Sequence, residues 1–155
     1  MIEINNQTKL KIDLKKTAAL ADAFLRAYKK SAWSVSLALV GPTRMRHLNR
    51  DYRGIDQATD VLSFPALGLV KKHLGEIIIN LAETRKTSKY RMMIEEIGLH
   101  PASCGRPPKT GRGDNYLFYF LFIHGLLHLI GYDDATEKGR REMMERGKEF
   151  LARNK

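Results

Sequence analysis

The feature that most constrains this chain is a pair of histidines, His124 and His128, spaced four residues apart in an apolar stretch. If the residues up to Ile130 form a helix, both imidazoles project from one face, one turn apart, where two nitrogens can share a metal ion. Gly131 can adopt the left-handed conformation that ends a helix, so the chain can turn back and bring in Asp134. The spacing therefore predicts a metal site made of His124, His128 and Asp134.

This spacing matches the long zincin pattern of metalloproteases, with two differences. Gly125 stands where those proteases carry the glutamate that acts as general base, which argues against peptide hydrolysis. The third ligand is a carboxylate rather than an imidazole, and carboxylate oxygen is an ordinary zinc donor. Two alternatives stay open: the histidines can be core residues without a metal, and Asp133 can replace Asp134 as ligand or orient a histidine.

The composition indicates one globular domain over residues 1–155. Hydrophobic residues make up 43% of the chain and charged residues 28%, and no apolar run is long enough to cross a bilayer. We see no signal peptide, and the single cysteine, Cys104, excludes an internal disulfide, so we expect a cytoplasmic protein without a membrane anchor. The lone cysteine also leaves histidines and carboxylates as the only metal ligands.

The charge of the chain points to a polyanionic partner. Lysine and arginine number 27 against 17 aspartate and glutamate residues, which gives a formal net charge of +10. A small domain this basic is typical of proteins that bind nucleic acid, and a membrane surface is the second expectation. A basic protein without such a partner is the remaining alternative.

Hydrophobic periodicity predicts short strands that alternate with amphipathic helices. We expect strands within residues 1–12, 33–40, 59–65 and 74–80. We expect helices over residues 14–30, 43–52 and 81–97, over the histidine segment up to 130, and over 136–153. The link at 66–73 is short enough for a hairpin. In the second helix, Met45, Leu48 and Tyr52 should face the core.

Three blocks of the sequence together resemble the YbeY family of bacterial endoribonucleases, the rRNA maturation factors. The blocks are LNRDYRG at 48–54, TDVLSFP at 59–65 with LGEIII at 74–79, and HGLLHLIGYDD at 124–134. Their order and spacing match the family as well, and the likeness covers most of the chain from about residue 35 onward.

The resemblance implies an α+β domain in which a small mixed four-stranded sheet is covered by helices, one of them a zincin-like metal helix. It implies one zinc ion held by His124, His128 and Asp134 in a basic cleft, with a functional arginine at Arg53. It further implies a single-strand-specific, metal-dependent endoribonuclease in rRNA processing, at the 3′ end of the small-subunit rRNA, and in ribosome quality control. The implied partners are ribosomal RNA, the small ribosomal subunit and its proteins, and neither DNA nor a membrane.

Two features depart from the family pattern. The family's third ligand is normally histidine. The Asp134 carboxylate cancels one unit of metal charge, so a bound water should be less acidified, and its harder oxygen donor should widen the tolerance for manganese or iron. We therefore expect a weaker or differently metallated site. The Gly- and Pro-rich stretch at 98–114 is longer than in the family and is predicted to be a loop, or a flap that contacts substrate. Arg53 can also simply pair with Asp56 or Asp60. A second function therefore stays open, an assembly factor that binds RNA or a ribosomal protein and holds a mainly structural metal.

Overall fold

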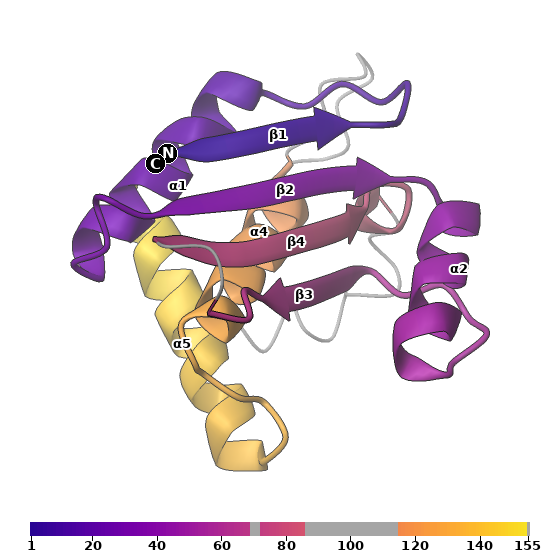
Figure 1. The fold of residues 1–155 in the computed structure, drawn as a ribbon. Helices are drawn as coiled ribbons and strands as arrows, with labels where there is room; N and C mark the ends of the chain where they lie inside the picture. The colour runs from indigo at the N-terminus through magenta and orange to yellow at the C-terminus, as the bar shows by residue number, and fades with distance from the viewer. Residues whose placement is uncertain (69–71, 86–114, 155) are drawn as a thin grey trace, which may run out of the picture.

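The computed structural model describes residues 1–68, 72–85 and 115–154 (Figure 1). The elements in chain order are β1 (Ile2–Asn6), α1 (Leu14–Ala27), β2 (Ser34–Val40), α2 (Pro42–Arg53), β3 (Val61–Pro65), β4 (His73–Asn80), the 3-10 helix η1 (Glu83–Arg85), α4 (Tyr116–Leu129) and α5 (Glu137–Arg153). This succession confirms the predicted α+β class. Of the helix predicted over 81–97, the structure describes only residues 81–85, which contain the 3-10 helix η1. The loop predicted over 98–114 lies outside the described residues.

The four strands form one mixed sheet in the order β1-β2-β4-β3. Strands β1, β2 and β4 run parallel, and β3 runs antiparallel to β4, as the predicted hairpin requires. The central strand β4 is buried on both faces, which explains its uninterrupted run of isoleucines from Ile77 to Ile79. The short strands β1 and β3 form the two edges of the sheet.

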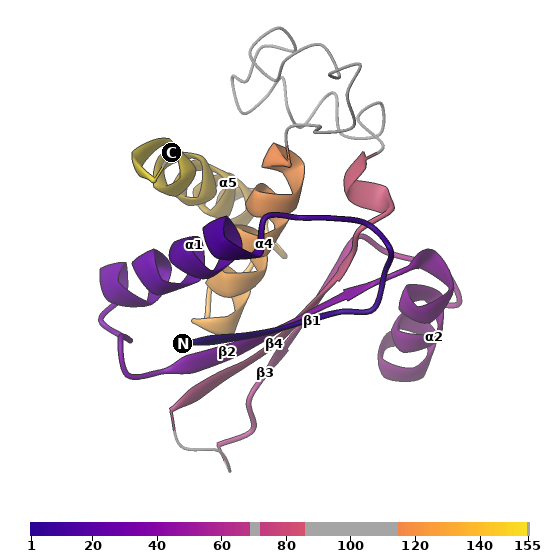
Figure 2. The same cartoon turned by 90° about the horizontal axis from the view of Figure 1, so that it is seen from above.

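Helices cover both faces of the sheet unequally (Figure 2). Helices α1, α4 and α5 pack on one face around a large core that includes Phe24, Phe118 and Phe122, whereas α2 alone covers a small cluster on the other face. Eleven of the fourteen residues of α4 are buried, because this helix packs against β3 and β4 of the sheet and against α5. The close packing of α4 against its neighbours fixes the positions of its two histidines, His124 and His128.

Local signals in the sequence set the helix ends. The Asp13 side chain caps α1 by accepting a hydrogen bond from the Lys16 amide at 2.9 Å. Gly54 ends α2 in the left-handed conformation, with φ of 71°. Within the part of the chain that the structure describes, none of the helices combines the length and the apolar character that a bilayer-spanning segment needs.

One predicted core residue is wrong. In α2, Met45 is fully buried and Leu48 is half-buried as expected, but Tyr52 is 68% exposed. The cluster under α2 is small, and the last turn of the helix extends beyond it, so the Tyr52 ring contacts the half-buried Phe64 but stays largely exposed. Helical periodicity identified the correct face of α2 but not how far the sheet extends beneath it.

Candidate metal centre

The structure brings the three predicted ligands together at one end of α4. The Nε2 atom of His124 lies 3.2 Å from Nε2 of His128 and 3.3 Å from Oδ2 of Asp134, and that oxygen lies 3.7 Å from Nε2 of His128. Zinc bonds of about 2.1 Å in tetrahedral geometry place neighbouring donor atoms about 3.4 Å apart. The three donor atoms therefore form a triangle of the size that a tetrahedral ion fits.

A backbone hydrogen bond fixes the orientation of His128. Its Nδ1 atom lies 3.1 Å from the carbonyl oxygen of Tyr132, which can only accept, so Nδ1 carries the proton and the lone pair of the neutral ring is on Nε2. Tyr132 is itself held in place: the guanidinium of Arg146 lies 4.8 Å from the centre of its ring, and the Tyr28 ring meets it edge-on at 6.4 Å. This packing holds Tyr132 in place, and the Tyr132 carbonyl in turn orients the predicted ligand His128.

His124 is the more buried of the two histidines, with 15% of its side chain exposed. Burial lowers the pKa of the His124 imidazole, and the neighbouring His128 lowers it further, while Asp134 and Asp60 act in the opposite direction. Among the described residues the buried Nδ1 atom has no hydrogen-bond partner. The neutral ring that results is the form that binds a metal, because a protonated imidazole has no lone pair to offer.

A tight turn carries Asp134 back to the histidines. Gly131 has φ of 101°, and its amide bonds to the His128 carbonyl at 3.0 Å as the helix ends. The Asp133 carboxylate accepts a hydrogen bond from the Ala135 amide at 2.9 Å, and the Asp133 carbonyl lies so close to Gly139 of α5 that a β-carbon there would overlap it. This geometry gives Asp133 a structural role and leaves Asp134 facing the two imidazoles.

Gly125 lies where α4 touches the sheet. A β-carbon at this position would lie 2.9 Å from Cγ2 of Ile77 in β4 and 3.2 Å from Oγ of Ser63 in β3. A side chain at this position, such as the glutamate of the protease pattern, would therefore require Ile77 to shift. Because Gly125 has no side chain, α4 can lie close to β3 and β4 at this point.

Comparison with known proteins decides the family. A profile of the family described as Endoribonuclease YbeY matches residues 3–99 and 110–155. The Endoribonuclease YbeY of Helicobacter pylori is 36% identical over 147 residues, which cover 94% of this chain and 85% of that protein. The protein of the same name from a Nitratiruptor species is 38% identical over 111 residues, 72% of this chain and 64% of its own length. The chain belongs to the YbeY endoribonuclease family.

The fold agrees with this assignment. A solution structure of a Thermotoga maritima protein matches with a TM-score of 0.56 and 25% sequence identity, and the match covers 99% of this chain and 89% of that one. The predicted resemblance to the YbeY family is thus confirmed by sequence over most of the chain, and the solved structure shows a similar fold.

Arg53, the arginine that the YbeY resemblance singled out, is the exposed last residue of α2. Helix α2 covers the face of the sheet opposite α4, and among the described residues no hydrogen bond or ion pair joins Arg53 to the three clustered side chains. Asp56, one of the alternative partners of Arg53, is instead bound by Arg46 through two hydrogen bonds of 2.8 and 2.6 Å. A catalytic role of Arg53 remains a prediction.

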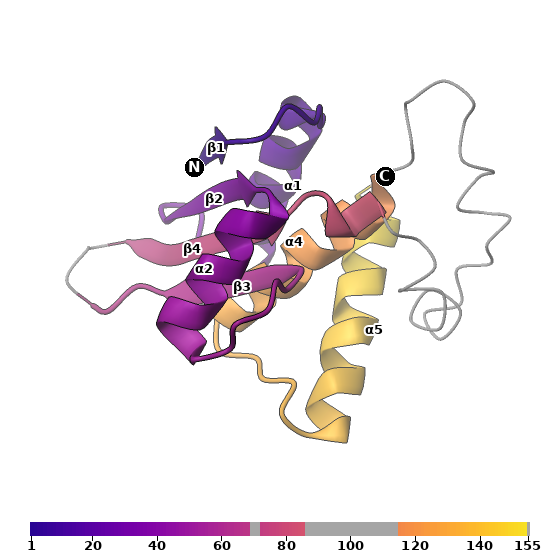
Figure 3. The same ribbon diagram turned by 90° about the vertical axis from the view of Figure 1, so that its right-hand side faces the viewer.

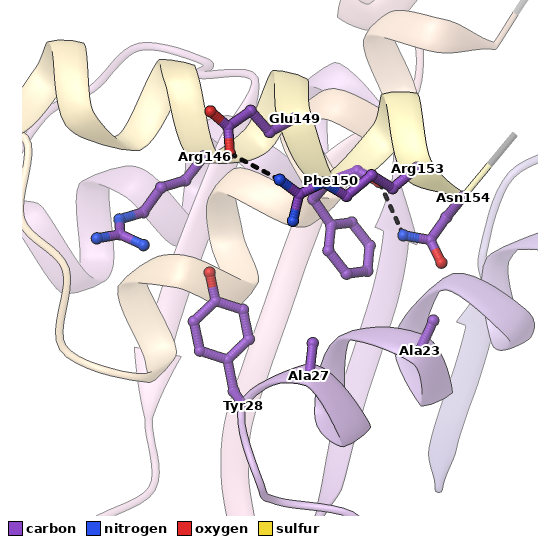
Figure 4. Close-up of a pocket in the computed structure, with 8 residues that line it drawn as sticks. All are labelled: Ala23, Ala27, Tyr28, Arg146, Glu149, Phe150, Arg153 and Asn154. Atoms are coloured by element: carbon purple, nitrogen blue, oxygen red, sulfur yellow. Dashed lines mark hydrogen bonds and ion pairs between the residues drawn. The ribbon is translucent and has the colours of Figure 1, made fainter.

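A groove of about 360 Å³ lies between α1 and α5, away from the three clustered residues (Figure 4). Its cations are already paired on their own helix: Arg146 with Glu142 at 2.8 Å, and Arg153 with Glu149 at 3.7 Å. The groove therefore offers little net charge to a ligand, and one of its lining residues, Arg146, packs on Tyr132.

Proposed function

We propose that this chain is a single metal-dependent endoribonuclease domain that cleaves single-stranded ribosomal RNA in the cytoplasm. The proposed tasks are maturation of the 3′ end of the small-subunit rRNA and ribosome quality control. Membership of the YbeY family supports the ribonuclease activity, and the net charge of +10 supports a polyanionic substrate. The observation that carries the proposal is the triangle of donor atoms formed by His124, His128 and Asp134.

The donor set suits one Zn²⁺ ion held by His124, His128 and Asp134. Two imidazole nitrogens and one carboxylate oxygen are ordinary zinc donors, and three protein ligands leave a coordination position open. When bound, such an ion supplies Lewis acidity toward water and toward a phosphoryl oxygen. The carboxylate lowers the net charge of the site by one unit relative to a three-histidine site, so manganese or iron is a plausible alternative to zinc.

The chain's own residues perform the remaining tasks in this proposal. The Tyr132 carbonyl keeps the Nε2 lone pair of His128 directed at the site, and burial keeps His124 neutral. Arg53 supplies a planar guanidinium, which pairs with two phosphate oxygens at once and matches the charge that develops on them during cleavage. The partners that follow are ribosomal RNA and the small ribosomal subunit with its proteins, whereas DNA and membranes are not expected.

The test combines metal analysis with RNA cleavage. We expect the purified protein to contain about one equivalent of a divalent metal, and His128→Ala to lose it. Arg53→Ala should lower the cleavage rate of a single-stranded RNA by about 100-fold or more while its RNA affinity changes little. The matched control is Arg141→Ala, which removes an arginine that is 81% exposed on α5.

The alternative function predicts a different result. An assembly factor with a structural metal would bind both the metal and RNA, and the wild-type protein would show no cleavage that depends on Arg53. A peptidase is already disfavoured by the close packing at Gly125. Metal-dependent cleavage that persists undiminished in both His128→Ala and Arg53→Ala would refute the proposal.

A further inference from the structure

An aromatic pair, the exposed Tyr52 and the half-buried Phe64, lies on the face of the sheet opposite α4. Tyr52, in the last turn of α2, is 68% exposed, and its ring centre lies 5.0 Å from that of Phe64 in β3, with the ring planes tilted by 57°. Ile55 follows in the next loop and is 50% exposed. Exposed aromatic and apolar side chains can bind a ligand that has an apolar face.

The helix that carries Tyr52 is basic. Helix α2 carries four arginines, at positions 44, 46, 50 and 53, and its last turn contains two of them. Arg46 and Arg50 pair with Asp56 and Asp51, at 2.6 and 3.0 Å. Arg53, which follows Tyr52 in the sequence, is exposed and forms no ion pair with any described residue. Aromatic rings beside guanidinium groups are what single-stranded nucleic acid requires, because bases stack on the rings and phosphates pair with the cations.

Strand β3 connects this surface to the metal centre. Side chains alternate along the strand, so Leu62 and Phe64 pack toward α2, while Val61 and Ser63 face α4. Ser63 lies against Gly125, the residue that follows the ligand His124. Since β3 is an edge strand with α2 on one side and α4 on the other, no further strand of the described sheet separates the two sites (Figure 3).

We infer that Tyr52 and Phe64 form a stacking platform for an unpaired base of the substrate RNA. This inference rests on the proposed ribonuclease function and adds to it a physical source of preference for single strands. A base inside a duplex is stacked on both faces by its neighbours, so it has no face to offer a protein ring, whereas an unpaired base can stack. The platform thus selects single-stranded RNA before any bond is cleaved.

The experiment measures the affinity of the full chain for a labelled single-stranded RNA by fluorescence anisotropy, with a chelator present to prevent cleavage. Tyr52→Ala should weaken binding by about 5- to 100-fold, the range that corresponds to loss of one base–aromatic stack. Tyr52→Phe keeps the ring and should bind within about twofold of wild type, while Tyr52→Leu keeps apolar bulk without a ring and should bind like Tyr52→Ala. Leu14→Ala is the matched control, because Leu14 is an apolar side chain 49% exposed on α1.

A duplex of the same sequence separates stacking from general electrostatic attraction. Its affinity should change by less than about twofold in Tyr52→Ala, because phosphate contacts do not need the ring. A fluorescent purine analogue in the single strand should be quenched on binding to wild type and less so on binding to Tyr52→Ala. Unchanged single-strand affinity in Tyr52→Ala, or an equal loss for duplex and single strand, overturns the platform.

The outcomes also separate the platform from the proposed function. If the wild-type protein cleaves RNA with metal and Tyr52→Ala binds RNA normally, the platform alone is wrong. If Tyr52 is required for single-strand affinity but the wild-type protein does not cleave RNA with any divalent metal, the platform holds and the proposed catalysis fails. Thermal melting of each variant checks that the fold is intact, which is expected for a residue as exposed as Tyr52.

Discussion

Gly125 stands where the zincin pattern of proteases has a glutamate, and its close contact with the sheet predicts that a glutamate is not tolerated there. The perturbation is Gly125→Glu, which restores the His-Glu-x-x-His pattern in the sequence. We expect the variant to be strongly destabilised and to have no peptidase activity. A β-carbon alone would lie 2.9 Å from Cγ2 of Ile77, a side chain with no exposed surface, so the added atoms meet a neighbour that has little room to yield.

The magnitude follows from a series of three substitutions. Gly125→Ala adds overpacking of about 1–3 kcal/mol and gains about 1 kcal/mol of helix propensity, so its free energy of unfolding should fall by about 1 kcal/mol. Gly125→Gln adds an amide near buried apolar atoms and should cost about 1–3 kcal/mol more. Gly125→Glu places a charge there, so we expect a total loss of about 3 kcal/mol or more.

Urea denaturation at two pH values checks this reasoning. Burial would raise the pKa of a glutamate at position 125 above its unfolded value, so the folded state would bind a proton more readily than the unfolded state. The free energy of unfolding of Gly125→Glu should therefore fall furthest below that of Gly125→Gln near pH 8, and this difference should shrink as the pH falls toward about 5. A Gly125→Glu protein as stable as wild type, or one that cleaves peptides, would show that the reasoning is wrong.

Three further outcomes follow from the same structure. Asp134→His should raise zinc affinity by about tenfold and narrow the tolerance for manganese, as measured by metal titration and RNA cleavage, and no change in either would contradict the charge argument. Gly139→Ala should lower metal affinity by about 10- to 100-fold, although alanine favours helices. Its β-carbon must displace the Asp133 carbonyl and with it the turn that carries Asp134. Unchanged affinity in a metal titration would exclude this coupling. Arg146→Ala should lower the free energy of unfolding in urea by about 0.5–1 kcal/mol through loss of its contact with Tyr132, and an unchanged midpoint would count against that contact.

Much of the architecture was predictable because the signals for it are local. The alternation of apolar residues predicted β2 within one residue of its observed bounds, and the short link between β3 and β4 correctly predicted their antiparallel pairing. The apolar segment ending near Ile130 was correctly predicted as a helix, observed as Tyr116–Leu129. The error at Tyr52 arose because helical periodicity says which side chains share a face but not how wide the surface beneath them is.

The sequence by itself determined the two imidazoles one turn apart and the glycine that lets the chain turn back, because helix geometry and the conformational freedom of glycine act over a few neighbouring residues. Only the tertiary structure decided which of two adjacent aspartates faces them, since that depends on how α5 packs against the turn through Gly139. The tertiary structure likewise revealed the close packing at Gly125 and the contact of the exposed Tyr52 with the half-buried Phe64. Both depend on which strand packs beside which helix, and contacts between residues far apart in the chain leave no periodic signal in the sequence.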